Sequence, residues 1–323
     1  MQAAAPPTSR DALTEPLVAR PRSPEAPPGR VRAARKAMRL HQWAKNGLVV
    51  LPALLAHEMG TPEVLVQVGV AFLAMGLVAS GTYVVNDLLD RERDRLHPTK
   101  KHRPFASGAL TPQFGWAFGP SLVALGFGIA WALLPLAFVG ALGVYLATTL
   151  AYSFKLKSVV LVDVVVLAAL YALRVLAGGA ATSIAVSEWL LAFSLFFFLG
   201  LALLKRYAEL RILEKEISAR DNGRGYTIED AAMLRAIGPA AGFMAVLVFA
   251  LYVTSPTVAE LYARPDLLWL AAPLLAYWTM RMWLLAHRGD LPDEPVAYAI
   301  RDVASYVVAA LTLGVLVLAS IPV

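Results

Sequence analysis

Apolar segments about as long as a bilayer is thick recur throughout this chain. Each is near the ~20 residues that a helix needs to cross the hydrocarbon core of a membrane. A mean hydropathy of +0.61 and a hydrophobic content of 58% lie far above the values of soluble domains. We therefore expect an all-α, polytopic membrane protein with nine spans. The expected spans are 43–57, 64–85, 114–133, 136–154, 159–179, 189–204, 233–253, 267–285 and 303–321.

The connections between these segments alternate in charge. Lysine and arginine crowd the connections 91–103, 155–157, 205–224 and 281–301. The alternate connections carry no lysine or arginine, except for Arg264. By the positive-inside rule the basic set faces the cytoplasm. The expected placement is a plasma membrane, with the N-terminus inside and the C-terminus outside.

The first 35 residues differ in composition from the rest. They are rich in proline and arginine and lack the apolar core of a secretory signal peptide. Such a segment buries too little surface to offset its ordering entropy, so we expect a disordered cytoplasmic tail over 1–35 and one membrane domain over 36–323. The chain has no cysteine, which excludes disulfides, thiolate metal sites and cysteine nucleophiles.

The second apolar segment ends in a run of acidic residues. On a helix Asp87, Asp90 and Asp94 share one face, which Asn86 borders. Carboxylates crowded at the mouth of a membrane helix repel one another and are costly to desolvate. A divalent cation removes both costs, and oxygen ligands suit Mg²⁺, which often bridges to substrate phosphates. We expect a Mg²⁺–diphosphate site facing the cytoplasm; a solvated helix end is the alternative.

A basic segment follows directly. Lys100, Lys101 and Arg103 lie between two prolines, Pro98 and Pro104, which stop the helix from continuing. Arginine binds phosphate through a bidentate fork and lysine binds it as a point charge. As a set these residues are candidates for phosphate binding, although ordinary positive-inside charge explains any one of them.

Charged residues also interrupt other apolar segments. Lys45 and Asn46 lie inside the start of the first segment, where a lysine either snorkels to the surface or meets an anion. Arg174 lies inside the fifth segment and needs an anionic partner from the protein or from a substrate.

The end of the sixth segment holds Lys205, Arg206, Tyr207 and Glu209. It mirrors the acidic end of the second segment in topology, so substrate binding is one interpretation. A pair between Lys205 and Glu209, four residues apart on a helix, is the other.

With these residues the chain resembles the UbiA superfamily of intramembrane prenyltransferases, which are nine-helix bundles with an active site facing the cytoplasm. Asn86, Asp87, Asp90 and Asp94 match the first Asp-rich motif of that superfamily residue for residue. The resemblance implies that Asp87, Asp90 and Asp94 are catalytic and hold Mg²⁺ with the diphosphate of the donor. It covers nearly the whole chain after the tail.

One branch, the decaprenyl-phosphate phosphoribosyltransferases, is more similar still. Five stretches resemble it, at 38–46, 97–104, 173–179, 205–210 and 291–302. The aromatic prenyltransferases of the superfamily carry a second Asp-rich motif after the sixth span. Here that place has Glu209 and Glu214, and no aspartate before Asp221.

The branch implies transfer of 5-phosphoribose from phosphoribosyl diphosphate to a decaprenyl-type polyprenyl phosphate, with release of diphosphate. Lys205 or Arg206 would contact the 5-phosphate, and Tyr207 or Glu209 the ribose. Two alternatives stay open. One is prenyl transfer from a prenyl diphosphate to an aromatic acceptor such as 4-hydroxybenzoate. The other is a transporter or lipid-binding protein, which the clustering of carboxylates at one face disfavours. The implied partners are these substrates and the bilayer, with no nucleic acid.

Overall fold

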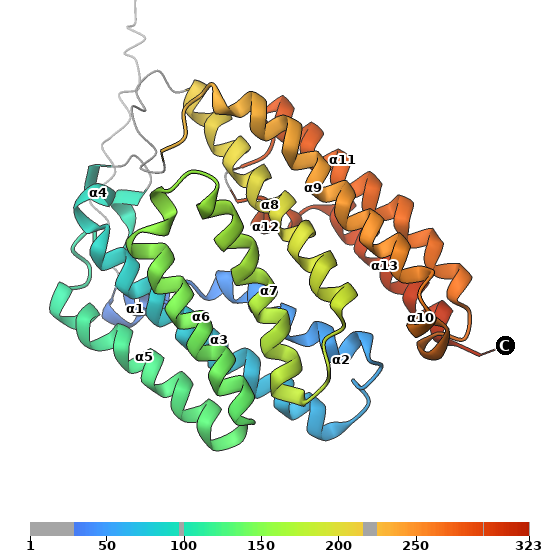
Figure 1. Ribbon diagram of the computed structural model, residues 1–323. Coiled ribbons are helices and arrows are strands. Elements are labelled where there is room, and N and C mark those ends of the chain that lie inside the picture. The colour runs from blue at the N-terminus through green and yellow to red at the C-terminus, as the bar shows by residue number, and fades with distance from the viewer. Residues whose placement is uncertain (1–28, 97–99, 216–224, 293, 323) are drawn as a thin grey trace, which may run out of the picture.

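The computed structural model describes residues 29–96, 100–215, 225–292 and 294–322, and every regular element in these ranges is a helix. The long helices pack side by side as a bundle (Figure 1). They are α3 (Pro62–Leu89), α5 (Pro112–Leu133), α6 (Leu136–Phe154), α7 (Val162–Thr182), α8 (Glu188–Lys215), α9 (Asp230–Val253), α11 (Ala271–Arg288) and α13 (Val303–Ser320).

Seven of these helices are long and apolar enough to cross a membrane, and they coincide with seven of the expected spans. The first expected span takes another form, a 3₁₀-helix, η1 (Leu40–Val50), followed by a short α2 (Leu51–Leu55) that carries Pro52 at its start. The eighth is built from η4 (Pro265–Leu270) and α11, whose last turn carries His287 and Arg288. The class of fold is confirmed, and the count of nine spans stays a prediction.

The chain becomes helical before the end of the expected disordered tail. Helix α1 (Arg30–Ala37) includes residues 30–35 of the expected tail, while residues 1–28 lie outside the described part, so the division into a tail and a membrane domain stays a prediction. Ala33 and Ala37 are buried in a small apolar cluster with Val84 and Phe105. Burial of this alanine face explains why the segment orders, since its remaining residues are mostly basic.

Close helix contacts surround α3 because small residues line it. A side chain added at Gly81 would lie 2.6 Å from the carbonyl oxygen of Gly119 on α5. One added at Gly126 would lie 2.9 Å from the carbonyl oxygen of Ala74 on α3. Small residues let membrane helices approach backbone to backbone, which favours van der Waals packing where no hydrophobic force joins them.

A small residue also allows η1 to pack closely against α7. A Cβ at Gly178 would overlap the carbonyl oxygen of Val49, which is fully buried. Helix η1 also contacts α3, where Trp43 donates from Nε1 to Ser80 Oγ at 2.9 Å. The first expected span is therefore wedged between α3 and α7.

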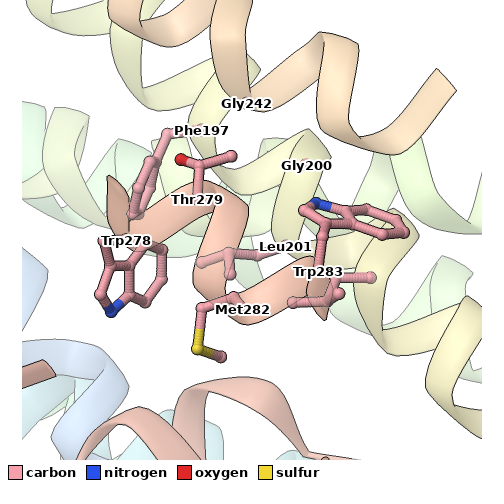
Figure 2. A pocket seen from close by; sticks show the side chains of 9 residues that line it. Phe197, Gly200, Leu201, Gly242, Trp278, Thr279, Met282 and Trp283 are labelled. Atoms are coloured by element: carbon pink, nitrogen blue, oxygen red, sulfur yellow. The ribbon is translucent and has the colours of Figure 1, made fainter. Parts of the chain in front are cut away.

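The second half of the bundle packs α8, α9 and α11 around aromatic side chains (Figure 2). Gly200 on α8 lets the backbone of α9 approach at Gly242, and Gly242 in turn leaves room for Thr279 of α11. Trp278 and Trp283 of α11 line the same region. The cavity that these residues line has a volume of about 10 Å³, which is at the lower limit for one water molecule. These residues therefore serve to pack the helices together, and the candidate site lies elsewhere.

Gly178→Ala should lower the free energy of unfolding by about 1–3 kcal/mol, because the added methyl group overlaps the Val49 backbone and forces η1 away from α7. Thermal unfolding in detergent measures the effect. Gly143→Ala on α6, where nothing lies within 4 Å of the new Cβ, is the matched control. Equal unfolding temperatures for the two variants would contradict the close approach.

Candidate active site

The carboxylates at the end of α3 are paired with cations from distant segments. Asp87 is buried, with a side chain 2% exposed, and it accepts from Arg39 and, at 3.2 Å, from Arg103 Nη1. The same Arg103 nitrogen lies 2.7 Å from Asp94 Oδ2. Asp87 and Asp94 therefore meet at one guanidinium. Arg39 also lies over the ring of Tyr83, 5.2 Å from its centroid.

Asp90 faces a different cation. Lys157 Nζ, in the short η3 (Leu156–Ser158) between α6 and α7, donates to Asp90 Oδ2 at 3.0 Å. Asn86 Nδ2 donates to the same oxygen at 3.2 Å. Helix α3 ends at Leu89, and α4 (Arg91–Leu96) continues it in nearly the same register. The amide nitrogens of Asp90 and Asp94 donate to the carbonyl oxygens four residues earlier, each at 2.9 Å.

The three aspartates have the donor chemistry of a Mg²⁺ site, with carboxylate oxygens on successive helical turns. Asp87 and Asp94 pair with Arg103, and Asp90 pairs with Lys157, so the three carboxylates do not converge on one point. Within the described ranges no three His, Cys, Asp or Glu side chains are grouped closely enough to hold a metal ion. The residue types fit the ion, and the metal role of Asp87, Asp90 and Asp94 stays a prediction.

A second charged group joins η1 to α8 through one carboxylate. Glu294 lies just before α12 (Pro295–Ala299), and its Oε1 accepts from Lys205 Nζ at 2.7 Å. Its Oε2 accepts from Lys45 Nζ at 3.1 Å. Burial opposes ionisation of this carboxyl, but the two ammonium groups outweigh it and lower the pKa of Glu294 to about 2. Lys45 is thus paired inside the protein, and Lys205 pairs with Glu294 in place of the considered partner Glu209.

Arg206 lies in a buried network. Its Nε donates to Asp163 Oδ2 at 2.5 Å, and its Nη1 pairs with Glu209. The side chains of Arg206 and Asp163 are 1% and 0% exposed. Tyr226 donates to Asp163 Oδ1 at 2.6 Å and accepts from the amide of Leu161. Burial and the bond to Asp163 raise the pKa of Tyr226, so this hydroxyl keeps its proton and completes the network.

The remaining candidates lie around these groups. Arg174 is buried, and its Nε donates to Asn46 Oδ1 at 3.1 Å. Tyr207 is also buried, with its hydroxyl 3.2 Å from His287 Nδ1. Lys100 and Lys101 lie in η2 (Lys100–His102), where Lys101 is exposed, and the residues 97–99 before them lie outside the described ranges.

Three residues of the site were not predicted from the sequence, namely Arg39, Lys157 and Glu294. Lys157 belonged to the basic connections that set the orientation, and Glu294 was one acidic residue in a basic connection. A signal was present for Arg39 and for Glu294, because they lie in the stretches 38–46 and 291–302 that resemble the phosphoribosyltransferase branch. Arg39 differs from the other two in its backbone. Its backbone is left-handed, with φ of 51°, which a non-glycine residue adopts only where its surroundings impose it.

Fold and site together define a polytopic helical membrane enzyme whose charged groups gather beyond the end of one long apolar helix. The chain belongs to the UbiA prenyltransferase family, whose model matches residues 47–305. It is therefore a transferase of the UbiA type.

Relatives carry several names. The decaprenyl-phosphate phosphoribosyltransferase of Mycobacterium tuberculosis is 34% identical over 91% of this chain and 93% of its own length. The nodulation protein NoeC of Azorhizobium caulinodans is 37% identical over 88% of this chain and 92% of its own length. The protein y4nM of Sinorhizobium fredii is 38% identical over 87% of this chain, which spans 55% of that longer protein.

Solved structures share the fold. A UbiA homolog from Archaeoglobus fulgidus bound to GPP and Mg²⁺ superposes with a TM-score of 0.65 over 88% of this chain and 99% of its own. Its identity to this chain is 16%, so the similarity concerns the architecture of the bundle.

Glu294→Gln should destabilise the protein at neutral pH, because Lys45 and Lys205 lose their shared carboxylate. The wild-type pKa is depressed, so the stabilisation is complete above about pH 5 and is lost as the pH falls toward 2. The difference in unfolding temperature between wild type and variant should therefore narrow on acidification. Glu63→Gln, at an exposed position in the first turn of α3, is the control. A difference that does not depend on pH would contradict the pairing.

Proposed function

We propose that this protein transfers 5-phosphoribose from phosphoribosyl diphosphate to a polyprenyl phosphate and releases diphosphate. The observation that carries the proposal is the asymmetry between the charged residues that α3 and α8 contribute. The end of α3 offers three aspartates, whereas α8 offers Lys205, Arg206 and Glu209. A relative named for this reaction aligns over 93% of its own length, which supports the same choice.

In this proposal Asp87, Asp90 and Asp94 hold Mg²⁺ and face the cytoplasm. The ion, when bound, would neutralise the charge of the diphosphate leaving group. Arg103 lies between Asp87 and Asp94, and its pairing with both carboxylates supports a role in binding the diphosphate. Asn86 orients Asp90 by donating to its carboxylate.

The 5-phosphate of the donor needs cations. Lys205 and Lys45 come from separate helices and meet at Glu294, which makes them the best-placed pair. Arg206 is held on two sides by Asp163 and Glu209 and is fully buried, so we assign it a positioning role under Lys205. Lys100 and Lys101 are assigned to phosphate contacts at the rim, and Tyr207 to the ribose.

The acceptor phosphate is ionised at neutral pH and needs no general base. One of its oxygens forms a bond to C1 of the ribose, while the bond from C1 to diphosphate breaks and its electron pair leaves with diphosphate. Charge that develops on the sugar and on the leaving group would be stabilised by fixed side chains. Catalysis then consists mainly of positioning and electrostatic stabilisation.

Two parallel reactions with the purified protein and Mg²⁺ test the proposal. One contains phosphoribosyl diphosphate and a polyprenyl phosphate, and the other contains a prenyl diphosphate and 4-hydroxybenzoate. Mass spectrometry of the lipid fraction should find a phosphoribosylated lipid in the first reaction alone. A prenylated aromatic product in the second reaction, with none in the first, would replace this function with prenyl transfer.

Asp87→Ala, Asp90→Ala and Asp94→Ala should each lower turnover by on the order of 100-fold, because each removes an oxygen ligand from the leaving-group site. Removal of divalent ions with a chelator should abolish turnover, and Mg²⁺ should restore it. Asp266→Ala, in η4, tests whether loss of any carboxylate has this effect. Near-normal turnover in all three variants would refute the metal site.

A further inference from the structure

Arg174 is a cation deep inside the bundle. It lies twelve residues after Val162, the first residue of α7, which places it about 18 Å along the helix at 1.5 Å per residue. This is about halfway through a hydrocarbon core of roughly 30 Å. Arg174 is 5% exposed, and a charge at this depth is costly unless an anion neutralises it.

The partners that the fold provides for Arg174 are all neutral. Its Nε donates to Asn46 Oδ1 at 3.1 Å, its Nη1 to the carbonyl oxygen of Leu170 at 2.5 Å, and its Nη2 to the Tyr145 hydroxyl at 2.9 Å. The guanidinium lies over the rings of Tyr145 and Tyr171, 4.8 and 5.4 Å from their centroids. No carboxylate in the described ranges pairs with it. Arg206, which is buried as deeply, has Asp163 and Glu209.

A second, independent feature lies beside this guanidinium. Asn46 is 1% exposed, and its Oδ1 is occupied by Arg174. Its Nδ2 is buried without a hydrogen-bond partner. A buried donor left unpaired is uncommon in native proteins and marks a position where an acceptor belongs. Arg174 and Asn46 Nδ2 together offer a positive charge and a free N–H within one side-chain length of each other.

We propose that Arg174 and Asn46 form the subsite for the phosphate monoester of the lipid acceptor. This inference rests on the proposed function, and it names which of the two phosphorylated substrates this site binds. The depth of the site and its apolar surroundings favour the lipid phosphate over the sugar donor as its ligand. Tyr145 and Leu170, which contact Arg174, belong to an apolar core that also contains Val49 and Leu142. A head group that arrives from the bilayer therefore brings its own chain into apolar surroundings. The soluble donor is assigned to the charged groups around Asp87 and Lys205, outside this apolar core.

A binding assay without any donor tests the subsite. Purified protein is titrated with a polyprenyl phosphate and with the polyprenol of the same length, and the unfolding temperature is recorded. Wild type should bind the phosphate more tightly than the alcohol. Asn46→Asp places a carboxylate against Arg174 in nearly the same volume. This variant should keep the fold and lose the preference by roughly 10- to 100-fold, the loss expected for a charge-assisted hydrogen bond.

Arg174→Gln should lose the same preference, and Arg281→Gln, which removes a guanidinium paired with Asp302, should keep it. In turnover assays Asn46→Asp should raise the KM for the lipid phosphate and leave the KM for phosphoribosyl diphosphate unchanged. Three results would each overturn the inference: no preference for the phosphate in wild type, an unchanged preference in Asn46→Asp, or a change confined to the KM for the sugar donor.

The outcomes separate this inference from the function on which it rests. If wild type prefers the lipid phosphate and Asn46→Asp does not, while no phosphoribosylated lipid forms, the subsite stands and the proposed reaction fails. If the product forms but both variants keep the wild-type preference, the reaction stands and the subsite is wrong. Binding of 4-hydroxybenzoate that depends on Arg174, with no preference for the lipid phosphate, would assign the site to an aromatic acid.

Discussion

A carboxylate that ends a membrane helix must find a cation, and this requirement organises the first half of the protein. Asp87 and Asp94 are nearly inaccessible to solvent, so each needs a partner brought from elsewhere in the chain. For these two, Arg39 comes from the entry to η1 and Arg103 from the connection to α5. Asp90 between them pairs with Lys157 from the connection to α7. Three connections that would otherwise be independent are thereby tied to the end of one helix.

Elsewhere in the protein, buried cations likewise need a carboxylate from a distant segment. Lys45 and Lys205 share Glu294, so a residue from the connection before α12 joins η1 to α8. Arg206 draws Asp163 from the start of α7, and through it Tyr226 from the segment before α9. Because breaking a buried pair leaves a charge without a partner, each of these links resists separation of the helices more than its number of atoms suggests.

The sequence predicted the features that depend on neighbouring residues, and did not predict the contacts between residues far apart in the chain. Seven spans could be predicted because length and hydropathy are local, and the spacing of Asp87, Asp90 and Asp94 was readable because a helix fixes the angle between residues. Lys157 could not be matched with Asp90, which lies 67 residues away. Arg206 looked available to a substrate because its partner Asp163 lies 43 residues earlier, on another helix. Charge type was visible in the sequence, but the partner of each charge was decided by packing.

The 3₁₀ form of η1 determines which residues can act together. With three residues per turn, Trp43, Asn46 and Val49 stand in one straight row along the helix. Trp43 meets Gly76 and Ser80 of α3, and Asn46 and Val49 meet α7. In an α-helix of 3.6 residues per turn, the ends of this row would point about 120° apart. The tighter winding therefore keeps this row of side chains aligned. As a result, one narrow edge of η1 packs between α3 and α7 along the length of η1.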